Sequence, residues 1–452
     1  MTPRFGTDGI RGAANSELSP ELVLGLGRAA GHVLGRDSAD RPVFLVGRDT
    51  RASSGLLAQA LAAGLASCGV DVVDLGVVPT AAVALLSRDI GADAGAVVSA
   101  SHNPAADNGV KFFARGGTKL TPADEEEIEE LLEGEEGRHL EDAGRLPRPT
   151  GGAVGRIRTR PELAERYLEI LLATVSVPFD GLKVVVDAAN GAASVLGPEV
   201  LRRVGADVDV RFAEPDGTNI NAGCGATAPD ALAAAVVATG ADVGLAFDGD
   251  ADRLIAVDAT GNVVDGDHIL AVCGLDMHSR GELPGDAIVA TVMSNVGLEV
   301  LLRESGIEVV ECPVGDRNVL KALEDRDLAL GGEQSGHVIF RHLSPTGCGL
   351  LTALQLVQVL GRTGMSLADL AGRMRSYPQV AVALPLHDRE KLDTAAGFWD
   401  VVSATRDQLG NTGRVVVRPS GTEPVLRVMV QAPTEIEATG AVERIKTAAS
   451  VI

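Results

Sequence analysis

Short apolar runs alternate with amphipathic segments along most of the chain. In the first hundred residues, helices are predicted over about 20–35, 53–67 and 80–88, and strands at Pro42–Val46, Val70–Leu75 and Ala94–Val98. Pro42–Val46 is a short continuous apolar run, which is typical of a strand buried on both faces of a sheet. Regular alternation of such strands with helices predicts an α/β domain.

The same pattern restarts twice further along the chain. A stretch rich in Gly, Pro and Arg, residues 140–159, is interpreted as a linker. Beyond it, strands are predicted at Lys183–Asp187, Val208–Phe212, Val243–Phe247, Ile288–Val292 and Ile307–Cys312. The last part, from about residue 375, has two predicted strands, Gly413–Arg418 and Val425–Val430, and a terminal helix.

These patterns predict three similar α/β domains with mixed sheets and a smaller C-terminal α+β domain. The expected boundaries are 1–150, 151–252, 253–373 and 374–452. Four strands are followed directly by polar loops, the last three of which contain glycine, namely Ser99–Pro104, Asp248–Arg253, Gly331–His337 and Arg418–Pro424. Since ligands of open α/β sheets bind beyond the carboxyl ends of the strands, the active site is expected in a central cleft between the domains.

The loop that begins at Asp248 carries the strongest metal signal. Asp248, Asp250 and Asp252 alternate, and alternate residues in an extended loop can aim their carboxylates at one point. Three clustered like charges repel one another unless a cation lies among them, and hard oxygen ligands favour Mg²⁺, Ca²⁺ or Mn²⁺. An EF-hand is excluded because Arg253 stands where that loop needs glycine. The alternative is an ordinary acidic surface turn.

The loop after the strand Ala94–Val98 holds a serine beside a histidine. Ser101 is a candidate nucleophile or phosphate carrier, with an ordinary turn residue as the alternative. His102 could activate it, although adjacent loop residues often point apart. Lys111 follows ten residues later, and a lysine at a strand edge is the alternative to a catalytic role. The surrounding sequence is not G-x-S-x-G, so a hydrolase nucleophile elbow is not supported.

The third loop alternates a carboxylate, a hydroxyl and an imidazole. In an extended backbone Glu333, Ser335 and His337 would project to one side, where they suit sugar hydroxyls, and His337 could act as a general acid or base. An ordinary hairpin loop is the alternative.

The fourth loop combines a guanidinium, two hydroxyls and backbone N–H groups, which is the chemistry of a phosphate cradle. A plain hairpin connection is the alternative, and no P-loop accompanies it. The residues concerned are Arg418, Ser420, Gly421 and Thr422.

Composition narrows the kind of ligand. The 452 residues carry 40 Lys and Arg against 62 Asp and Glu, a formal charge of −22, which argues against nucleic acid or an anionic membrane as partner. The five cysteines form no C-x-x-C pair, so a disulfide framework or structural zinc site is not expected and a reducing cytoplasm fits best. Neither a signal peptide nor a run of about 18 apolar residues is found, so no membrane span is expected.

Together the four loops resemble those of the α-D-phosphohexomutase family, over essentially the whole chain and in the family's order. Ser99–Pro104 resembles its phosphoserine loop, Asp248–Arg253 its metal loop, Gly331–His337 its sugar loop and Arg418–Pro424 its phosphate loop. Arg4–Gly12, Gln334 and the segment Pro215–Asn221 resemble the branch that acts on an amino-sugar phosphate. Three positions depart from the family pattern: Ala251 replaces a commoner Gly, Asn318 an aromatic residue, and Cys348 an Asp.

The resemblance implies an isomerase that interconverts glucosamine 6-phosphate and glucosamine 1-phosphate, for UDP-N-acetylglucosamine and cell-wall precursors. Phosphorylated Ser101 would donate its phosphoryl group, and a hexosamine 1,6-bisphosphate would be the intermediate and activator. Mg²⁺ would be held by Asp248, Asp250, Asp252 and the Ser101 phosphate, with Arg11 and Arg253 beside it. Lys111 and His337 match the acid/base candidates, Glu333 and Ser335 would hold the sugar, and Arg418, Ser420, Gly421 and Thr422 the other phosphate.

Three alternatives to this reaction stay open at this point. One is a sibling branch of the family that acts on mannose or glucose phosphates. Another is a phosphatase-like enzyme that uses the metal and Ser101 for net hydrolysis, and the last is a catalytically silent phosphosugar sensor. A small phosphosugar is the expected partner in each case, with a homodimer as the candidate assembly.

Overall fold

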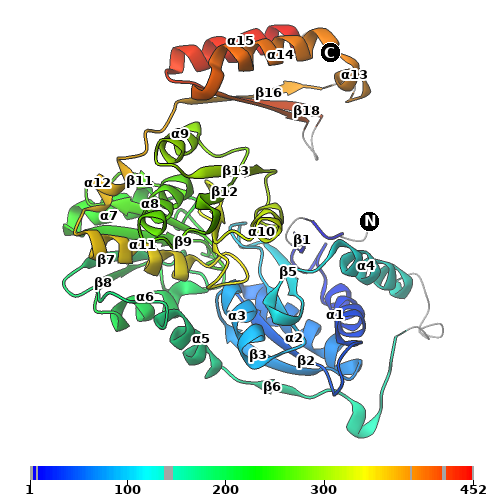
Figure 1. The fold of residues 1–452 in the computed structure, drawn as a ribbon. Coiled ribbons are helices and arrows are strands. Elements are labelled where there is room, and N and C mark those ends of the chain that lie inside the picture. The colour runs from blue at the N-terminus through cyan, green and yellow to red at the C-terminus, as the bar shows by residue number, and fades with distance from the viewer. Residues whose placement is uncertain (1–3, 7–8, 137–145, 387–388, 420–423, 450–452) are drawn as a thin grey trace.

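Four β-sheets follow one another along the chain (Figure 1). The computed structural model describes residues 4–6, 9–136, 146–386, 389–419 and 424–449. The first three sheets are mixed and the last is antiparallel, which confirms the predicted fold class of three α/β domains and a smaller C-terminal α+β domain.

The first sheet has six strands in the order β1-β5-β4-β2-β3-β6. Its strands are β1 (Ile10–Ala13), β2 (Val43–Arg48), β3 (Asp71–Val77), β4 (Ala94–Val98), β5 (Asp107–Phe113) and β6 (Ile157–Thr159). Alternate residues of β2 face opposite sides: Phe44 and Val46 pack with α1 (Pro20–Gly35), α2 (Ala52–Ser67) and α4 (Pro122–Glu136), and Leu45 packs with α3 (Thr80–Ile90). Both faces are therefore covered, as the continuous apolar run in β2 predicts.

The predicted linker is only partly a linker. Residues 137–145 lie outside the described residues, but β6 pairs in parallel with β3, with Arg158 opposite Val73. The first sheet therefore extends past the expected boundary at residue 150. The strand is short and fully exposed, so no apolar run marks it in the sequence.

The second sheet has the order β11-β10-β9-β7-β8 and the third has the order β13-β12-β14-β15. The second contains β7 (Lys183–Asp187), β8 (Asp207–Arg211), β9 (Val243–Phe247), β10 (Leu254–Asp258) and β11 (Val263–Val264), with α5 (Leu163–Leu172), α6 (Ala193–Arg203) and α7 (Asp230–Thr239). The third contains β12 (Ala287–Thr291), β13 (Glu308–Cys312), β14 (Leu330–Gly332) and β15 (Val338–Phe340), with α8 (Gly266–Ser279), α9 (Val296–Glu304), α10 (Asp316–Asp325), α11 (Gly349–Thr363) and α12 (Leu367–Ala371). Because β10 folds back antiparallel on β9, the second sheet continues beyond residue 252, where a boundary was expected.

One apolar cluster runs through the first three domains. It joins Leu85 of α3, Phe247 of β9 and Leu354 of α11, all of them buried. Burying a side chain of this size contributes roughly 1.5–3 kcal/mol, so the shared core holds the three domains as one body. The loops at their sheet edges are thereby fixed relative to one another.

The C-terminal domain has its own core and stands apart from the other three (Figure 1). Its antiparallel sheet has the order β16-β18-β17, formed by β16 (Gln379–Pro385), β17 (Arg414–Pro419) and β18 (Val425–Gln431), with α13 (Arg389–Thr394), α14 (Ala396–Leu409) and α15 (Glu435–Ala449). β16 is missing from the sequence prediction because it is an edge strand with no fully buried residue. None of the helices in the described ranges is long and apolar enough to cross a membrane.

A small polar network attaches the C-terminal domain to the third domain. The side chain of Asn295 donates to the Tyr377 carbonyl (3.0 Å) and accepts from the Tyr377 N–H (2.9 Å) in the connecting segment. Gln431 of β18 accepts from the N–H of Val296 (2.7 Å) at the start of α9. The N–H of Asn295 in turn donates to the buried carboxylate of Asp267 (2.7 Å), so this attachment rests on a group that titrates.

We expect Asp267→Asn to stabilise the protein above neutral pH. Burial, with the neighbouring Asp265, raises the pKa of Asp267 to about 7, and its second carboxylate oxygen has no hydrogen-bond partner. The unfolded chain releases this proton at about pH 4, so the folded state loses stability as pH rises from about 4 to 7. The amide keeps the acceptor without the charge, and should gain about 2 kcal/mol at pH 8 and much less at pH 5. Thermal melts of both proteins from pH 5 to 8 measure the difference, and an equal difference at every pH would contradict the prediction.

Candidate active site

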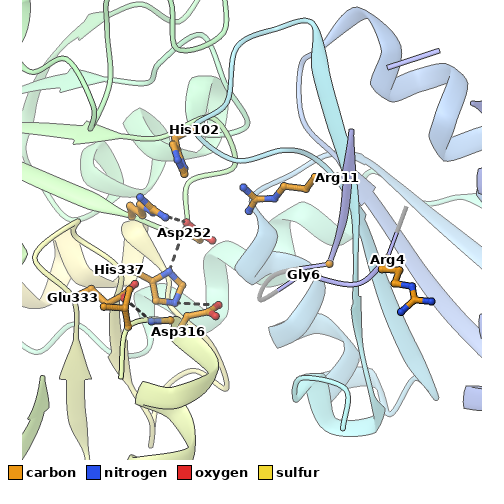
Figure 2. Close-up of a pocket in the computed structure, with 12 residues that line it drawn as sticks. Arg4, Gly6, Arg11, His102, Asp252, Asp316, Glu333 and His337 are labelled. Carbon is orange, nitrogen blue, oxygen red and sulfur yellow. Dashed lines mark hydrogen bonds and ion pairs between the residues drawn. The ribbon is translucent and has the colours of Figure 1, made fainter. Parts of the chain in front are cut away.

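A cavity of about 390 Å³ lies where the first three domains meet (Figure 2). The sequence candidates that line it are Arg11, His102, Asp252, Arg253, Glu333 and His337. Four further candidates are buried beside the cavity, namely Ser101, Lys111, Asp248 and Asp250. Ser101 donates to Asp248, and Lys111 donates to Asp250 and Asp252. Residues from three predicted loops therefore converge, as expected for strand ends that face one cleft.

Ser101 lies three residues beyond the end of β4 and is held in a strained backbone conformation. Its φ of 52° lies in the left-handed region, which costs a non-Gly residue energy and is found mostly where function requires it. Its N–H donates to Ser99 Oγ (3.0 Å), whose hydroxyl donates to Asp49 (2.6 Å). Its own Oγ donates to Asp248 Oδ2 (2.6 Å) and lies 3.4 Å from His102 Nδ1. The serine hydroxyl is therefore aimed at the acidic loop.

Two supporting residues of this loop were not predicted from the sequence. Arg51 is buried and donates to the carbonyls of Ser101 (2.9 Å) and Asn103 (2.8 Å), while Asp49 accepts from Arg51 Nε (2.8 Å). Asp49 follows β2 directly, and Arg51 lies two residues further on, at the carboxyl edge of the first sheet. The strand-end rule that selected the other loops therefore applies here too, and would have found them.

The three aspartates lie on a tight turn and not on the extended loop that was expected. The N–H of Ala251 donates to the Asp248 carbonyl (2.9 Å), and Ala251 has a φ of 56°. The turn packs so closely on the serine loop that a Cβ at Gly249 would lie 2.6 Å from the Ser101 carbonyl oxygen. One oxygen of each carboxylate lies within 4.8 Å of the others, so the residues converge by a different backbone path than predicted.

The chemistry of this buried triad fits a divalent cation. Asp250 Oδ1 and Asp252 Oδ1 are buried and have no hydrogen-bond partner, which is costly unless another group binds them. Burial and the charges of Asp252 and Asp250 raise the pKa of Asp248 well above its usual range. Hard carboxylate oxygens in this arrangement could hold Mg²⁺, Ca²⁺ or Mn²⁺.

Lys111 lies inside the sheet and not at its edge. It stands in β5, which pairs with β1 on one side and β4 on the other, and it is 4% exposed. Its Nζ donates to Asp250 Oδ2 (2.8 Å) and Asp252 Oδ2 (3.2 Å). Although burial raises the pKa of Asp252, Lys111, His337 and Arg253 lower it well below its usual range, so this carboxylate is held ionised.

The third loop is a hairpin turn, so the prediction of three side chains on one face of an extended segment is wrong. The N–H of Glu333 donates to the carbonyl of His337 (3.0 Å), which places these two residues opposite each other. Ser335 is exposed at the tip and does not line the cavity. Glu333 Oε1 accepts from the Gly315 N–H (3.0 Å), so the carboxylate is fixed at the cavity wall.

His337 is buried between two carboxylates. Its Nδ1 lies 3.7 Å from Asp252 Oδ1 and its Nε2 lies 4.0 Å from Asp316 Oδ2 (Figure 2). Burial lowers the pKa of His337, but Asp252, Asp316 and Glu333 outweigh it and raise the pKa above its usual value. Gly347 leaves room for the ring, because a Cβ there would lie 2.3 Å from Nε2. The imidazole is therefore poised as a proton donor.

Two arginines bring positive charge to the same cavity. Arg11 of β1 points into the cavity (Figure 2), and Arg253 Nε lies 3.8 Å from Asp252 Oδ1. Burial, with Arg253 and Arg11, lowers the pKa of His102, which favours a neutral ring. Two guanidinium groups that line the cavity together with His102, the neighbour of Ser101, suit the oxygens of a phosphoryl group.

Most of the fourth predicted loop lies outside the described residues. Arg418 is exposed in β17 and lines a separate hollow between the third and C-terminal domains, not the cavity described above. Ser420, Gly421 and Thr422 lie outside the described residues. The predicted phosphate cradle therefore stays a prediction.

Cys348, one of the departures from the family pattern, has a structural place. Its Sγ caps α11 by accepting from the Leu351 N–H (3.4 Å) and lies 3.3 Å from the buried Tyr167 hydroxyl. Burial raises the pKa of this thiol to about 11, so it stays protonated and unreactive. The sulfur thus fills a helix-cap position for which aspartate is also suited.

The fold and the site define a mutase of phosphorylated sugars. Four models described as phosphoglucomutase/phosphomannomutase domains match the chain in order: α/β/α domain I at residues 2–139, II at 165–261, III at 265–377 and the C-terminal domain at 382–448. The chain belongs to the α-D-phosphohexomutase family. It is 50% identical over 445 residues to phosphoglucosamine mutase of Desulforudis audaxviator, covering 98% of this chain and 97% of the relative. It is 49% identical to that of Heliobacterium modesticaldum, covering 98% of both chains.

Solved structures share the whole fold. A phosphoglucomutase/phosphomannomutase family protein from Burkholderia thailandensis superposes with a TM-score of 0.82 at 25% identity, covering 98% of this chain and 97% of the other. N-acetylphosphoglucosamine mutase of Aspergillus fumigatus, solved with GlcNAc-6P and magnesium, gives a TM-score of 0.68 at 18% identity, covering 99% and 95%. The four-domain arrangement is therefore shared beyond close relatives.

Proposed function

We propose that this chain works as a phosphoglucosamine mutase, an isomerase that interconverts glucosamine 6-phosphate and glucosamine 1-phosphate. The observation that carries the proposal is the Ser101 hydroxyl, 2.6 Å from a carboxylate of the buried aspartate triad and beside the cavity that holds Arg11, Glu333 and His337. Full-length relatives at about 50% identity carry the same name. A nucleophile, a cation site and sugar-binding groups are the parts that this reaction requires.

The reaction passes a phosphoryl group through Ser101. In the forward direction the P–Oγ bond of phosphorylated Ser101 breaks, and a new P–O bond forms to the C1 hydroxyl of glucosamine 6-phosphate. The hydroxyl proton passes to a basic group, Ser101 Oγ takes up a proton as it leaves, and the product is the 1,6-bisphosphate. The bisphosphate then reorients and its 6-phosphoryl group returns to Ser101 Oγ, which gives up its proton, while the C6 oxygen takes up a proton.

The triad is proposed to hold one Mg²⁺, with an oxygen of the Ser101 phosphate as a further ligand. The two unpartnered buried carboxylate oxygens of Asp250 and Asp252 support this, and the Aspergillus relative was solved with magnesium. A bound cation neutralises charge on the transferring group. Asp248, Asp250 and Asp252 would hold the cation, and Lys111 keeps two of these carboxylates in place by donating to Asp250 and Asp252.

The other candidates surround the reacting group. Arg11 and Arg253 are proposed to hold the oxygens of the transferring phosphoryl group, with neutral His102 beside Ser101. Glu333 would bind a sugar hydroxyl from the cavity wall, while Ser335, at the turn tip outside the cavity lining, stays a predicted sugar ligand. His337, as the protonated imidazole, would supply the proton when Ser101 takes back its phosphoryl group, and Lys111 is the second candidate for proton transfer. Arg418 with Ser420, Gly421 and Thr422 would hold the non-reacting phosphate.

The cellular location is proposed from the state of the cysteines. All five cysteines are free, which supports the reducing cytoplasm as the location.

A comparison of three sugar phosphates tests the function directly. We expect one preparation to show the highest kcat/KM for glucosamine 6-phosphate, ahead of glucose 6-phosphate and mannose 6-phosphate. Product analysis should show isomer without release of inorganic phosphate. A preference for a neutral sugar would replace the proposal with the sibling reaction, and net phosphate release would replace it with hydrolysis.

A further inference from the structure

The central cavity has an acidic wall that phosphate binding does not require. Arg11 reaches into the cavity from the first domain, whereas Glu333 and Asp316 line its far side beside His337 (Figure 2). Phosphate oxygens are repelled by carboxylates, and neutral sugar hydroxyls need a hydrogen-bond acceptor but no second negative charge. A cationic group on the sugar would match this second charge.

Asp316 was not among the residues predicted from the sequence. It begins α10, and its side chain is 11% exposed. Its Oδ1 accepts from the Arg317 N–H (2.7 Å), which fixes the carboxylate, and its Oδ2 contacts Lys119 of the first domain. Because Gly315, the residue before it, donates to Glu333, the carboxylates of Asp316 and Glu333 are held on the same stretch of wall.

A second observation points to a ligand at this wall. His337 Nε2 is buried, has no hydrogen-bond partner and lies 4.0 Å from Asp316 Oδ2, beyond hydrogen-bond distance. His337 is 3% exposed and lines the same cavity. A buried ring N–H without a partner is costly, and an acceptor on the ligand, such as the sugar hydroxyl next to the amine, would satisfy it at this point.

The ion pair with Lys119 does not by itself explain why a carboxylate stands at position 316. The first and third domains are joined beside it by a second ion pair, in which Arg317 donates to Glu125 (2.9 Å). Asp316 differs from Glu125 in that it lines the cavity. An incoming ammonium could share the Asp316 carboxylate with Lys119, since a carboxylate offers about four acceptor sites.

We propose that Asp316 recognises the ammonium group at C2 of the amino-sugar phosphate and sets the preference for this substrate over neutral hexose phosphates. The inference rests on the proposed function and names the residue behind its sugar specificity. The amino group is what distinguishes glucosamine from glucose, and a charge-assisted contact to it is stronger than one to a hydroxyl. Glu333 accepts from a neighbouring hydroxyl in this arrangement.

The test measures kcat/KM for glucosamine 6-phosphate and glucose 6-phosphate with wild type, Asp316→Asn and Lys119→Met. Asp316→Asn should lower the ratio of the two values (amino sugar to neutral sugar) by about 10- to 100-fold. The loss should fall mainly on KM, because the amine takes no part in bond making. Lys119→Met removes the same ion pair but keeps the carboxylate, and should leave the ratio as high as in wild type or raise it.

Two results would overturn the inference. If Asp316→Asn lowers kcat/KM equally for the amino sugar and the neutral sugar, Asp316 supports the cavity wall but does not recognise the amine. If Lys119→Met lowers the ratio as much as Asp316→Asn, the ion pair between the domains and not the carboxylate sets specificity. A wild type that prefers the neutral sugar would instead contradict the proposed function, and this outcome is visible before any variant is made.

Discussion

Ser101→Ala should abolish mutase turnover, lowering kcat by at least about 10³-fold, because no other group can carry the phosphoryl group between substrates. The serine Oγ is buried, directed at Asp248 and held by a strained backbone that two neighbouring side chains stabilise. The alanine variant keeps this backbone but has no oxygen to phosphorylate. We expect it to fold, with a melting temperature lowered by only a few degrees, since one buried hydrogen bond to Asp248 is lost.

Intact-mass analysis and peptide mapping after incubation with a hexose 1,6-bisphosphate provide the direct readout. Wild type should gain the mass of one phosphoryl group on the peptide that contains Ser101, and the variant should gain none. Ser99→Ala is the matched control: it removes the hydroxyl that accepts from the Ser101 N–H, so it should slow turnover about tenfold while phosphorylation of Ser101 persists. Normal turnover by Ser101→Ala would remove Ser101 from the mechanism.

The position of the site, but not its internal geometry, could be predicted from the sequence. Strands at Ala94–Val98 and Val243–Phe247 are continuous apolar runs, so their polar ends were visible, and strand ends at one sheet edge converge by topology. The prediction of extended loops was wrong at Asp248–Asp252 and Glu333–His337. Both are turns with a residue at positive φ, at Ala251 and Gly336, and one such residue reverses the chain.

Contacts between segments far apart in the chain could not be predicted from the sequence. Thr80 donates to Asp250 Oδ2 (2.7 Å) across 170 residues, and its N–H donates to the Asp250 carbonyl (2.9 Å). Nothing in a helix N-terminus predicts such a partner, because it depends on how the first and second domains pack. Asp316 escaped notice for the same reason, since only the closure of α10 against the first domain brings it to the cavity.

The net charge of −22 is consistent with a phosphorylated substrate once the charges are placed. Acidic residues gather on surface helices such as α4, while Arg11 and Arg253 line the cavity. A local positive field in a cleft attracts a small anion regardless of the overall sign. The acidic groups inside the cleft are Glu333, Asp316 and the aspartate triad, in which one oxygen of each buried carboxylate lies within 4.8 Å of the others.

This triad leads to the second large effect: Asp250→Asn should make the metal-free protein more stable and the enzyme inactive. Removing one of three buried like charges relieves repulsion, which we expect to stabilise the metal-free protein by about 1–3 kcal/mol. The amide oxygen can still accept from Lys111 and Thr80, as Asp250 Oδ2 does. Its N–H₂ takes the place of the unpartnered Oδ1 and can donate to a neighbouring carboxylate. The same change removes a proposed Mg²⁺ ligand, so kcat should fall by at least about 10³-fold.

Melting temperatures with EDTA and with saturating Mg²⁺ separate these two effects. Wild type should gain about 2.7 kcal/mol when Mg²⁺ is present at a hundred times its dissociation constant, and the variant should gain much less. Glu324→Gln, which removes one exposed carboxylate from α10, is the control and should behave as wild type in both buffers. An Asp250→Asn protein that is less stable than wild type in EDTA would show that Lys111 already balances the triad. Retention of the full Mg²⁺ shift would place the cation elsewhere. If Asp250→Asn raises the stability of the metal-free protein and lowers kcat, the wild-type triad lowers the free energy of unfolding in order to hold a cation beside Ser101.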